Sequence, residues 1–410
     1  MTILKKNKLY RTLAISTFFT KFGASMYNLV FIAFAANMES NKLAVGIANI
    51  VVLLPVLLTL FIGIKADETR QKAKWLINLG FLQALLFLLV ALLTSSKTWA
   101  AFSTVCLINV ISDLISDYRG GLELPIFQQN VKQEDLMEAH SFNQFIAYFC
   151  NICGQGFGVW ILSISNDNFF LIASINALTF LFSAIILLKH KKFLTHPTVE
   201  LQKQSLKKKI LDTYYGLKEV FQESDKSSFN LMLLAILLIN ALGSGFSSIY
   251  NIYFLDKPLW SLSFSQSIFT IQVVTIIFSI LGSLTPKDYF AKQSLTTIIF
   301  LDAVIIFAIA VNNTIFGNQF LSMSGLAFLF YLGGKINPKL NSMLMTFLPS
   351  DMLARSGGFL SLLFMLAMPI GSSLFTICSL LSIQIAWMLY SVISLGVLLL
   401  SYKLNKVARV

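Results

Sequence analysis

Three charged residues stand out because they lie deep inside apolar stretches of the sequence. Lys21 lies about ten residues into an apolar run that begins near residue 11, and Asp113 and Asp117 lie four residues apart in the run 99–124. That spacing places the two carboxylates on one face of a helix. Opposite charge and loss of water shift the pKa of a carboxyl group in opposite directions. We therefore expect Lys21 to pair with Asp113, and Asp113 to carry an exchangeable proton.

Further charges accompany these residues. Arg119 and Glu123 follow Asp117 toward the end of the same run, where an ion cluster at the rim of a helix bundle would have a structural role. Lys335, in "YLGGKINPKLN", could line the same cavity as Lys21 or extend its side chain to the rim. A charge at the centre of a bilayer costs about 2.5–3.5 kcal/mol unless it is paired or hydrated. Lys21, Asp113, Asp117 and Lys335 are therefore the candidate coupling and cavity residues.

Composition identifies the environment of these charges. Of the 410 residues, 56% are hydrophobic and only 12% are charged, which is outside the range of soluble globular chains. Apolar runs of about 20 residues, long enough to cross a bilayer as helices, recur along the sequence. We predict an all-α integral membrane protein with twelve spans, at approximately 11–36, 43–64, 75–95, 99–124, 138–164, 167–189, 228–254, 262–284, 293–311, 318–346, 352–380 and 383–403.

Basic residues are distributed unevenly between the loops. With the N-terminus inside, all but four of the 31 Lys and Arg lie in or beside cytoplasmic segments, and the exceptions are Lys21, Lys42, Lys97 and Lys257. This positive-inside pattern predicts that both termini are cytoplasmic. The formal net charge of +12 is therefore attributed to topology, and no nucleic-acid partner is expected.

The sequence divides near its middle into two similar halves. We place one six-helix bundle at 1–189, a cytoplasmic linker with a basic amphipathic helix at 190–227, and a second six-helix bundle at 228–410. A shift of 217 residues lays "VKQEDLMEAHSFNQF" on "LPSDMLARSGGFLSL" and pairs Gly154 with Gly371. Two such pseudo-repeats enclose a cavity that can open to either side of the membrane in turn.

The loop between the second and third spans resembles a family signature. In "FIGIKADETRQKAKW", Gly63, Asp67 and Lys72 match the Gly, Asp and final basic positions of the signature of the major facilitator superfamily, whereas three positions between Asp67 and Lys72 depart from it. The corresponding loop of the second half keeps Gly282 but has Pro286 in place of the Asp. The resemblance covers essentially the whole chain. Within the superfamily, "SLKKKILDTYYGLKEVF" and "PSDMLARSGGF" look most like macrolide-efflux-type exporters.

This resemblance implies a gate on the cytoplasmic side. A carboxylate at Asp67 can lie near the positive end of a helix dipole and pair with a cation, and the repeat places Arg355 opposite it. We expect the gate to contain Gly63, Asp67, Arg70, Lys72 and Arg355, with a contact between Asp67 and Arg355 that holds the cytoplasmic side closed. A solvated loop that only orients the protein is the alternative.

Amide side chains are scattered through the spans among many Phe residues. Such a lining suits amphipathic or hydrophobic small molecules better than sugars, and about half of these amides are expected to join helices rather than contact a ligand. The candidates for substrate contact are Asn28, Asn109, Gln144, Asn240, Asn251 and Asn341.

Patterns for cofactors, metals or enzymatic chemistry are lacking in the sequence. Cys150 and Cys153 form a CxxC inside a span without a second pair, and the three His residues are scattered. Neither a metal site nor a nucleophile with a positioned base is therefore expected, and the chain is not expected to be an enzyme. The expected partners are a small-molecule substrate, protons and membrane lipid, for a monomer in the cell membrane.

Two classes of function remain open. The first is a secondary transporter, a proton-coupled exporter of amphipathic or hydrophobic molecules of the antibiotic-efflux type, which works as an antiporter by alternating access. Lys21 and Asp113 favour it. The second is a non-transporting immunity or sensory protein with the same fold, which the degenerate signature loop favours. An importer or a lipid flippase also fits the transporter class.

The positive-inside pattern yields a test of topology. A reporter that is active only in the cytoplasm should work when fused after Arg409, because nearly all Lys and Arg then lie inside. The matched control is a fusion after Lys97, in a predicted outer loop, which should be inactive. Activity after Lys97 and none after Arg409 would overturn the twelve-span topology.

Overall fold

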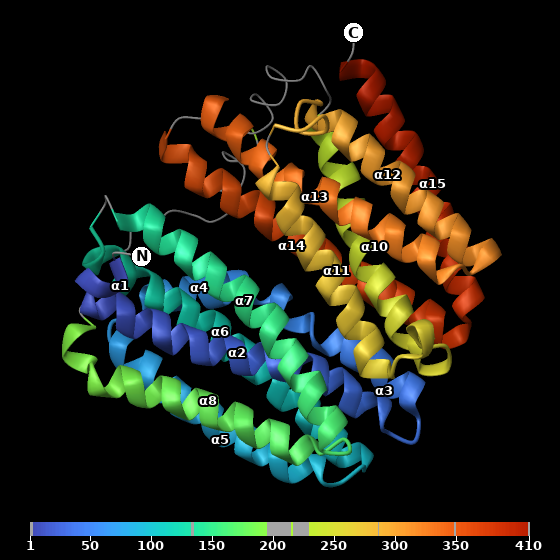
Figure 1. Cartoon of the computed structure of the whole chain (residues 1–410). Coiled ribbons are helices and arrows are strands. Elements are labelled where there is room, and N and C mark those ends of the chain that lie inside the picture. The colour runs from blue at the N-terminus through green and yellow to red at the C-terminus, as the bar shows by residue number, and fades with distance from the viewer. Residues whose placement is uncertain are drawn as a thin grey trace. The chain divides into compact units, whose positions relative to one another are not determined.

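The computed structural model of the protein describes residues 3–132, 135–194, 215, 229–285, 287–347 and 350–408 (Figure 1). Its first half contains α1 (Ile3–Lys6), α2 (Lys8–Ala36), α3 (Asn41–Val51), α4 (Thr59–Glu68), α5 (Lys72–Thr94), α6 (Trp99–Asn130), α7 (Leu136–Ile164) and α8 (Phe169–Lys189). Its second half contains α10 (Phe229–Asp256), α11 (Phe264–Leu284), α12 (Leu295–Val311), α13 (Gln319–Phe347), α14 (Ser350–Leu381) and α15 (Ile383–Ala408). The expected all-α architecture is confirmed.

Ten of the helices in the described ranges are long and apolar enough to cross a membrane. Their burial pattern agrees with that environment: on α5, Gln83 is fully buried, whereas Leu85 and Leu92 are exposed by 64% and 66%. Lipid is as apolar as a Leu side chain, so in a membrane protein the leucines can face outward while polar groups gather inside.

The second predicted span, 43–64, is wrong as a continuous helix. The chain there forms α3, a 3₁₀ turn η1 (Leu54–Leu57) and α4. Pro55 causes the break, because it has no backbone N–H and disfavours the helical conformation of the residue before it. Val56 and Leu58 instead donate to carbonyl oxygens three residues back, at Leu53 and Pro55.

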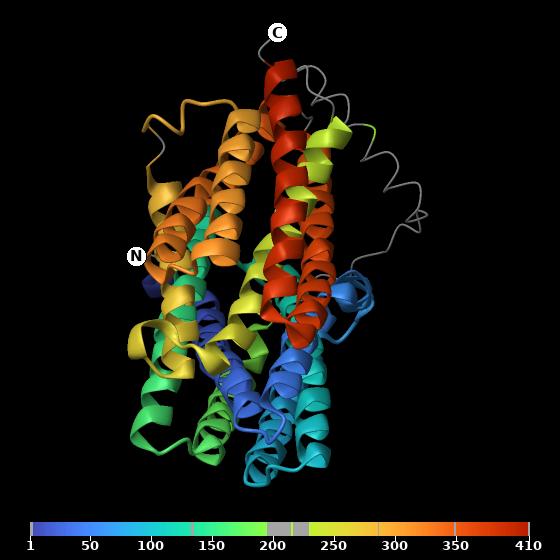
Figure 2. The ribbon, with the colours of Figure 1, turned by 90° about the vertical axis from the view of Figure 1, so that its right-hand side faces the viewer.

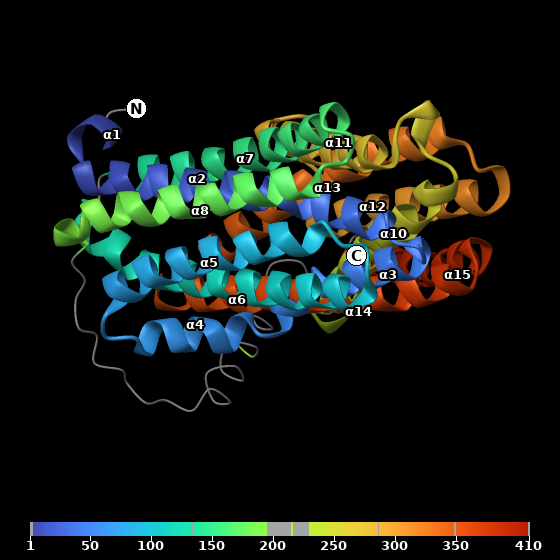
Figure 3. The ribbon, with the colours of Figure 1, turned by 90° about the horizontal axis from the view of Figure 1, so that it is seen from below.

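The helices divide into two compact units, with α1–α8 in the first and α10, most of α11 and α12–α15 in the second. In the first unit α2 packs against α7 and α8, and α5 lies between α8 and α6 (Figure 3). In the second unit α10 packs against α14 and α15, and α15 runs beside α12 (Figure 2). The pairs α2–α7 and α10–α14 correspond in the two halves.

Close contact in both pairs depends on a glycine. A Cβ added at Gly154 on α7 would lie 2.8 Å from the carbonyl oxygen of Phe22 on α2. A Cβ added at Gly371 on α14 would overlap the carbonyl oxygen of Ala241 on α10. Small residues let membrane helices approach closely, which gains van der Waals contact. The pairing of Gly154 with Gly371 is thus matched by equivalent packing, which supports the internal repeat.

We expect Gly371→Ala to destabilise the second unit, because its Cβ cannot be placed without moving α14 away from α10; overpacking of this kind costs about 1–3 kcal/mol. The control is Gly396→Ala on α15, where nothing lies within 4 Å of the added Cβ. Thermal unfolding of the purified protein in detergent measures both. Equal midpoints for the two variants would show that the helix contact does not need glycine.

Candidate transport site

A buried arginine joins four helices of the first unit. Arg119 on α6 donates to Oε1 of Gln83 on α5 (2.6 Å) and to Oγ of Ser183 on α8 (3.1 Å). Ser183 also shares a hydrogen bond with Ser16 of α2 (2.7 Å) and accepts one from Thr20 (2.9 Å). Arg119 is only 5% exposed, and it makes no ion pair within the described residues. Neutral oxygens therefore hold this charge inside the bundle.

The carboxylate of Glu123 lies one turn further along the same face of α6. Its Oε1 accepts a hydrogen bond from Thr17 Oγ1 on α2 (3.0 Å), and the charges of Arg119 and Lys21 both act on it. Lys21 lies one turn from Thr17 along α2, with its side chain exposed. A cation on each helix thus acts on the one carboxylate where α2 and α6 meet.

Asp113 and Asp117 occupy a different side of α6. At about 100° of rotation per residue, both lie more than 100° around the helix from Arg119. Asp117 is exposed and accepts a hydrogen bond from Thr59 Oγ1 of α4 (2.9 Å). Asp113 is partly buried, and the charge that acts on it is that of Asp117. These two carboxylates therefore face away from the buried Arg119 network.

The structure does not join Lys21 to Asp113, since no ion pair connects them among the described residues. The hydrogen bond between Thr17 and Glu123 fixes the register of α2 against α6. Lys21 lies about 6 Å along the axis from Thr17, whereas Asp113 lies about 15 Å from Glu123. Counting residues from the end of a helix does not reveal this offset along α6. That helix has 32 residues, more than the thickness of a bilayer requires, so its end does not mark the membrane surface.

The loop after α4 is held by a buried lysine. Lys72 is 3% exposed, and its Nζ donates to the carbonyl oxygen of Ala66 in the last turn of α4. A cation at this position offsets the negative end of the helix dipole. The hydroxyls of Thr69 and Tyr118 share a hydrogen bond that joins the loop to α6.

The remaining gate residues are less constrained. Gly63 has open space where a Cβ would lie, and Arg70 is exposed. Asp67 lies in α4 and Arg355 in α14, but both side chains lie outside the described part of the structure. The expected contact between Asp67 and Arg355 therefore stays a prediction.

A second lysine holds the corresponding loop of the second unit. Lys335 on α13 is 5% exposed and donates to the carbonyl oxygens of Gly282 (3.0 Å) and Thr285 (2.9 Å) and to Thr285 Oγ1 (2.7 Å). It also lies 4.5 Å from the ring centre of Tyr331, a cation–π contact. Lys335 therefore binds the end of α11 rather than lining a cavity or extending to the rim.

Asp288 supplies the carboxylate of this cluster, two positions after Pro286. Its Oδ2 forms an ion pair with Lys335 Nζ (2.9 Å) and accepts a hydrogen bond from the hydroxyl of Tyr331. Partial burial acts to raise the pKa of Asp288, but hydrogen bonds from Tyr331, Lys335 and the backbone N–H of Ala291 lower it to about 2. The carboxylate of Asp288 thus remains ionised throughout the physiological pH range.

The two loops are anchored by a repeat that the sequence comparison missed. "YRGGLELP" at 118–125 and "YLGGKINP" at 331–338 share Tyr, two Gly and Pro at the same spacing. Tyr331 bonds the Thr285 hydroxyl (3.1 Å), just as Tyr118 bonds Thr69. The second Gly of each pair packs closely against the helix that leads into the anchored loop, Gly121 near Ala66 on α4 and Gly334 against Ser279 on α11. A search at a shift of 213 rather than 217 would have found it.

The candidate substrate amides do not form one group. Asn109 and Asn240 donate to carbonyl oxygens of their own helices, at Val105 (3.1 Å) and Ile236 (2.9 Å). The side chains of Asn28 and Gln144 are exposed within their unit. The other two candidates are Asn251, which is partly buried, and Asn341, whose side chain lies outside the described structure.

Cysteine and histidine form no further centre within the described residues. Among the described residues, no group of three His, Cys, Asp or Glu is placed to hold a metal ion. Cys150 is buried and contacts the carbonyl oxygen of Phe18, whereas Cys153 is exposed.

Comparison with known proteins identifies the fold. No protein-family model and no curated protein sequence matches the chain. Among solved structures, it is similar to the peptide transporter POT in complex with sulfate (TM-score 0.69, 14% identity, 98% of this chain and 94% of that chain). It is also similar to the nucleoside transporter NupG (0.67, 14%, 98% and 99%) and to the POT family transporter PepTSo (0.67, 12%, 98% and 97%). The chain has the fold of these transporters, which confirms the major facilitator fold.

The cluster around Asp288 yields a pH-dependent prediction. Asp288→Asn should destabilise the protein, because Lys335 then loses its anionic partner while it remains buried. The folded pKa of about 2 lies below the ordinary value of 3.8. The extra stability of wild type over Asp288→Asn is therefore complete above pH 4 and disappears only as the pH falls toward 2. Thermal unfolding of both proteins between pH 8 and pH 2 measures it.

The neighbouring variant Lys287→Gln, which removes an exposed charge, is the control and should unfold like wild type. In a cycle with Lys335→Met, the coupling energy between Lys335 and Asp288 should be about 0.5–3 kcal/mol. Additive effects of the two substitutions would contradict the pair.

Proposed function

We propose that the chain is a secondary transporter that works by alternating access and exports amphipathic or hydrophobic small molecules. The observation that carries this proposal is the match of 98% of the chain to the folds of peptide and nucleoside transporters. The charged groups on α2 and α6 add support, because ionisable residues within membrane spans commonly mark substrate or proton pathways.

Protons are the proposed coupling ion, and Asp113 is the proposed carrier. Asp113 and Asp117 lie one turn apart on a single face of α6, so their charges repel each other, and a proton bound by either one removes that repulsion. The face of α6 that carries Arg119 and Glu123 is fixed by hydrogen bonds to α2, α5 and α8. In this proposal Lys21 acts through Glu123, and Asp113 exchanges the proton.

Sequence features support the proposed direction of transport and the proposed location. The resemblance of the linker and of "PSDMLARSGGF" to macrolide-efflux-type exporters supports export, and the positive-inside pattern supports a cell-membrane protein with cytoplasmic termini. The scattered amides among apolar side chains favour an amphipathic substrate over a highly charged one.

The proposal is tested with purified protein in liposomes, with a labelled macrolide and an imposed pH gradient. Wild type should accumulate the macrolide against its gradient, and a protonophore should abolish this accumulation. Asp113→Asn should reduce uphill transport at least tenfold and leave downhill exchange largely intact, because only the proton step is removed.

Asp167→Asn, which changes an exposed acid in the turn before α8, is the matched control and should transport like wild type. Full gradient-driven transport by Asp113→Asn would contradict its role as carrier. Loss of coupling in Glu123→Gln alone would place the proton site beside Lys21 instead. A wild-type protein that moves no compound of a hydrophobic drug panel would favour the non-transporting alternative.

A further inference from the structure

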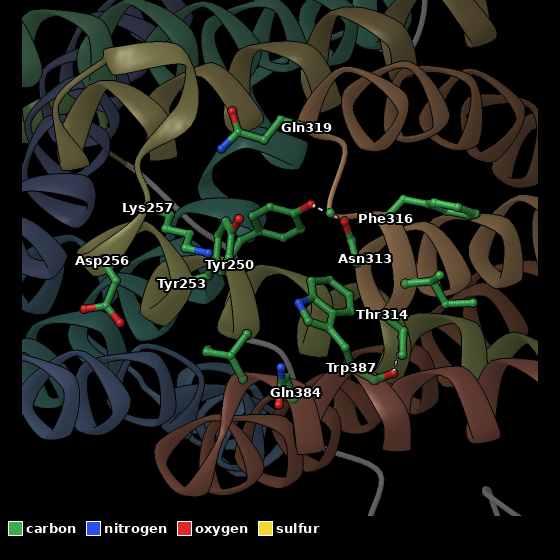
Figure 4. Close-up of a pocket in the computed structure, with 13 residues that line it drawn as sticks. Tyr250, Tyr253, Asp256, Lys257, Asn313, Thr314, Phe316, Gln319, Gln384 and Trp387 are labelled. Atoms are coloured by element: carbon green, nitrogen blue, oxygen red, sulfur yellow. Dashed lines mark hydrogen bonds between the residues drawn. The ribbon is translucent and has the colours of Figure 1, made fainter.

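The second unit contains a cavity of about 400 Å³ at the ends of three spans (Figure 4). Its lining comes from the last residues of α10, from the π-helical turn η5 (Asn312–Phe316) that extends α12, and from the first turn of α15. The volume is within the range of small-molecule pockets. In the proposed topology these helix ends lie at the outer surface of the membrane, at the opposite end of this unit from the loop held by Lys335.

The wall formed by η5 is built by local backbone geometry. Gly317 has a φ of +64° and its N–H donates to the carbonyl oxygen of Asn312 (2.7 Å), which closes the wide turn. Single π turns inside α-helices frequently occur at functional sites. Thr314 Oγ1 shares hydrogen bonds with the Trp387 carbonyl oxygen (3.3 Å) and with Ser391 Oγ (2.9 Å) on α15. Two walls of the cavity are thus fixed to each other before any ligand binds.

Three aromatic rings form an apolar surface in the cavity. Tyr250 contacts Trp387 (ring centroids 5.4 Å apart) and Tyr253 (5.8 Å), both nearly edge to face. Tyr250 and Trp387 are 3% and 4% exposed, so both rings are held rigidly and present only a small part of their surface to the cavity, whereas Tyr253 is partly exposed. A flat apolar molecule can pack against such a surface with little loss of side-chain freedom.

The polar groups left without partners in this cavity are mainly donors. Asn313 Oδ1 already accepts from Tyr250 (3.1 Å) and from Ser322 (2.6 Å), whereas its Nδ2 is buried and has no partner among the described residues. The indole Nε1 of Trp387 makes no hydrogen bond within the described structure and points into the cavity in Figure 4. An indole nitrogen can only donate. Neither group has an acceptor among the described residues.

The charged side chains of the cavity also favour a ligand that accepts hydrogen bonds. Lys257 makes no ion pair with any described residue, and its ammonium group is directed toward Tyr250 and Tyr253, whereas the carboxylate of Asp256 points away (Figure 4). Gln319, at the opposite wall, has its amide engaged with Trp260 N–H and with the Pro258 carbonyl. The unengaged groups therefore favour an anion.

The edge of the cavity adjoins the lipid-facing surface. Ile315 and Phe316, on the same turn as Asn313, are exposed by 68% and 73%. In a membrane-spanning chain such side chains lie against lipid, so a molecule dissolved at the interface could reach the cavity from the side. An amphipathic molecule concentrates at that depth of the bilayer.

We propose that this cavity is a binding site for a small amphipathic anion of the aromatic carboxylate class. Its carboxylate accepts hydrogen bonds from Asn313 Nδ2 and Trp387 Nε1 and pairs with Lys257. Its flat body packs against the rings of Tyr250, Tyr253 and Trp387. The site lies within one unit, so binding here does not require the transport cycle proposed above.

The test is equilibrium binding of tritiated 1-naphthaleneacetate to the full chain in phosphatidylcholine nanodiscs. Unlabelled 1-naphthaleneacetate should compete at least tenfold better than the neutral 1-naphthaleneacetamide or the cation 1-naphthylmethylammonium. Lys257→Gln and Asn313→Leu should each weaken binding about tenfold, as expected for loss of a charge-assisted hydrogen bond. Trp387→Phe keeps the ring, removes the donor and should weaken binding several-fold.

Lys287→Gln, at the other end of the same unit, is the control and should bind like wild type. Lys257→Glu should reverse the preference toward the ammonium compound, which a loss of folding cannot produce. Equal competition by the three compounds, or unchanged binding in Lys257→Gln, would overturn the proposal. So would displacement of the probe by phosphatidylglycerol in the nanodisc, which would assign the cavity to a lipid headgroup. Binding is measured without transport, so its failure is distinct from failure of the proposed function.

Discussion

The arrangement of the first unit depends on the need to satisfy a guanidinium group buried among membrane helices. An unpaired charge in the bilayer core costs several kcal/mol. Arg119 reduces this cost by donating to neutral oxygens of Gln83 and Ser183, while its Nε has no partner among the described residues. These bonds fix the rotation of α6 about its axis. With α6 in this orientation, Glu123 faces Thr17, whereas Asp113 and Asp117 face another side of the helix. The position of every charged candidate on α6 follows from this one side chain.

Much of the fold could be predicted from the sequence because each of its main determinants is local. Apolar run length marks the spans, and a glycine at matching positions, Gly154 and Gly371, marks helix contacts that the structure shows in both halves. The continuous second span was wrong because Pro55 interrupts it, and a count of apolar residues does not weigh the lost backbone N–H. A proline marks a position where such a break can occur but does not require one, since Pro369 lies inside α14 without ending that helix.

The candidate site was less predictable, because it depends on the register between helices that are distant in sequence. Lys21 and Asp113 were expected to pair, but their positions differ by about 9 Å along the helix axes. Only the hydrogen bond between Thr17 and Glu123 reveals this difference. Lys335 was expected in a cavity or at the rim, but it holds a loop. Its carboxylate partner is Asp288, because the signature position of the Asp is occupied by Pro286. The repeated Tyr-x-Gly-Gly-x-x-x-Pro segment was visible in the sequence and would have indicated that role.

Alternating access is the central claim, and distances between the two units test it most directly. Spin labels would be placed, in a background without the four native cysteines, at Lys74 and Lys292 for the cytoplasmic side and at Lys97 and Leu381 for the outer side. Pulsed dipolar spectroscopy in nanodiscs would then follow both distances as pH and macrolide concentration change. Our account predicts opposite changes, with one distance increasing as the other decreases. Two distances that stay constant under all conditions would contradict it.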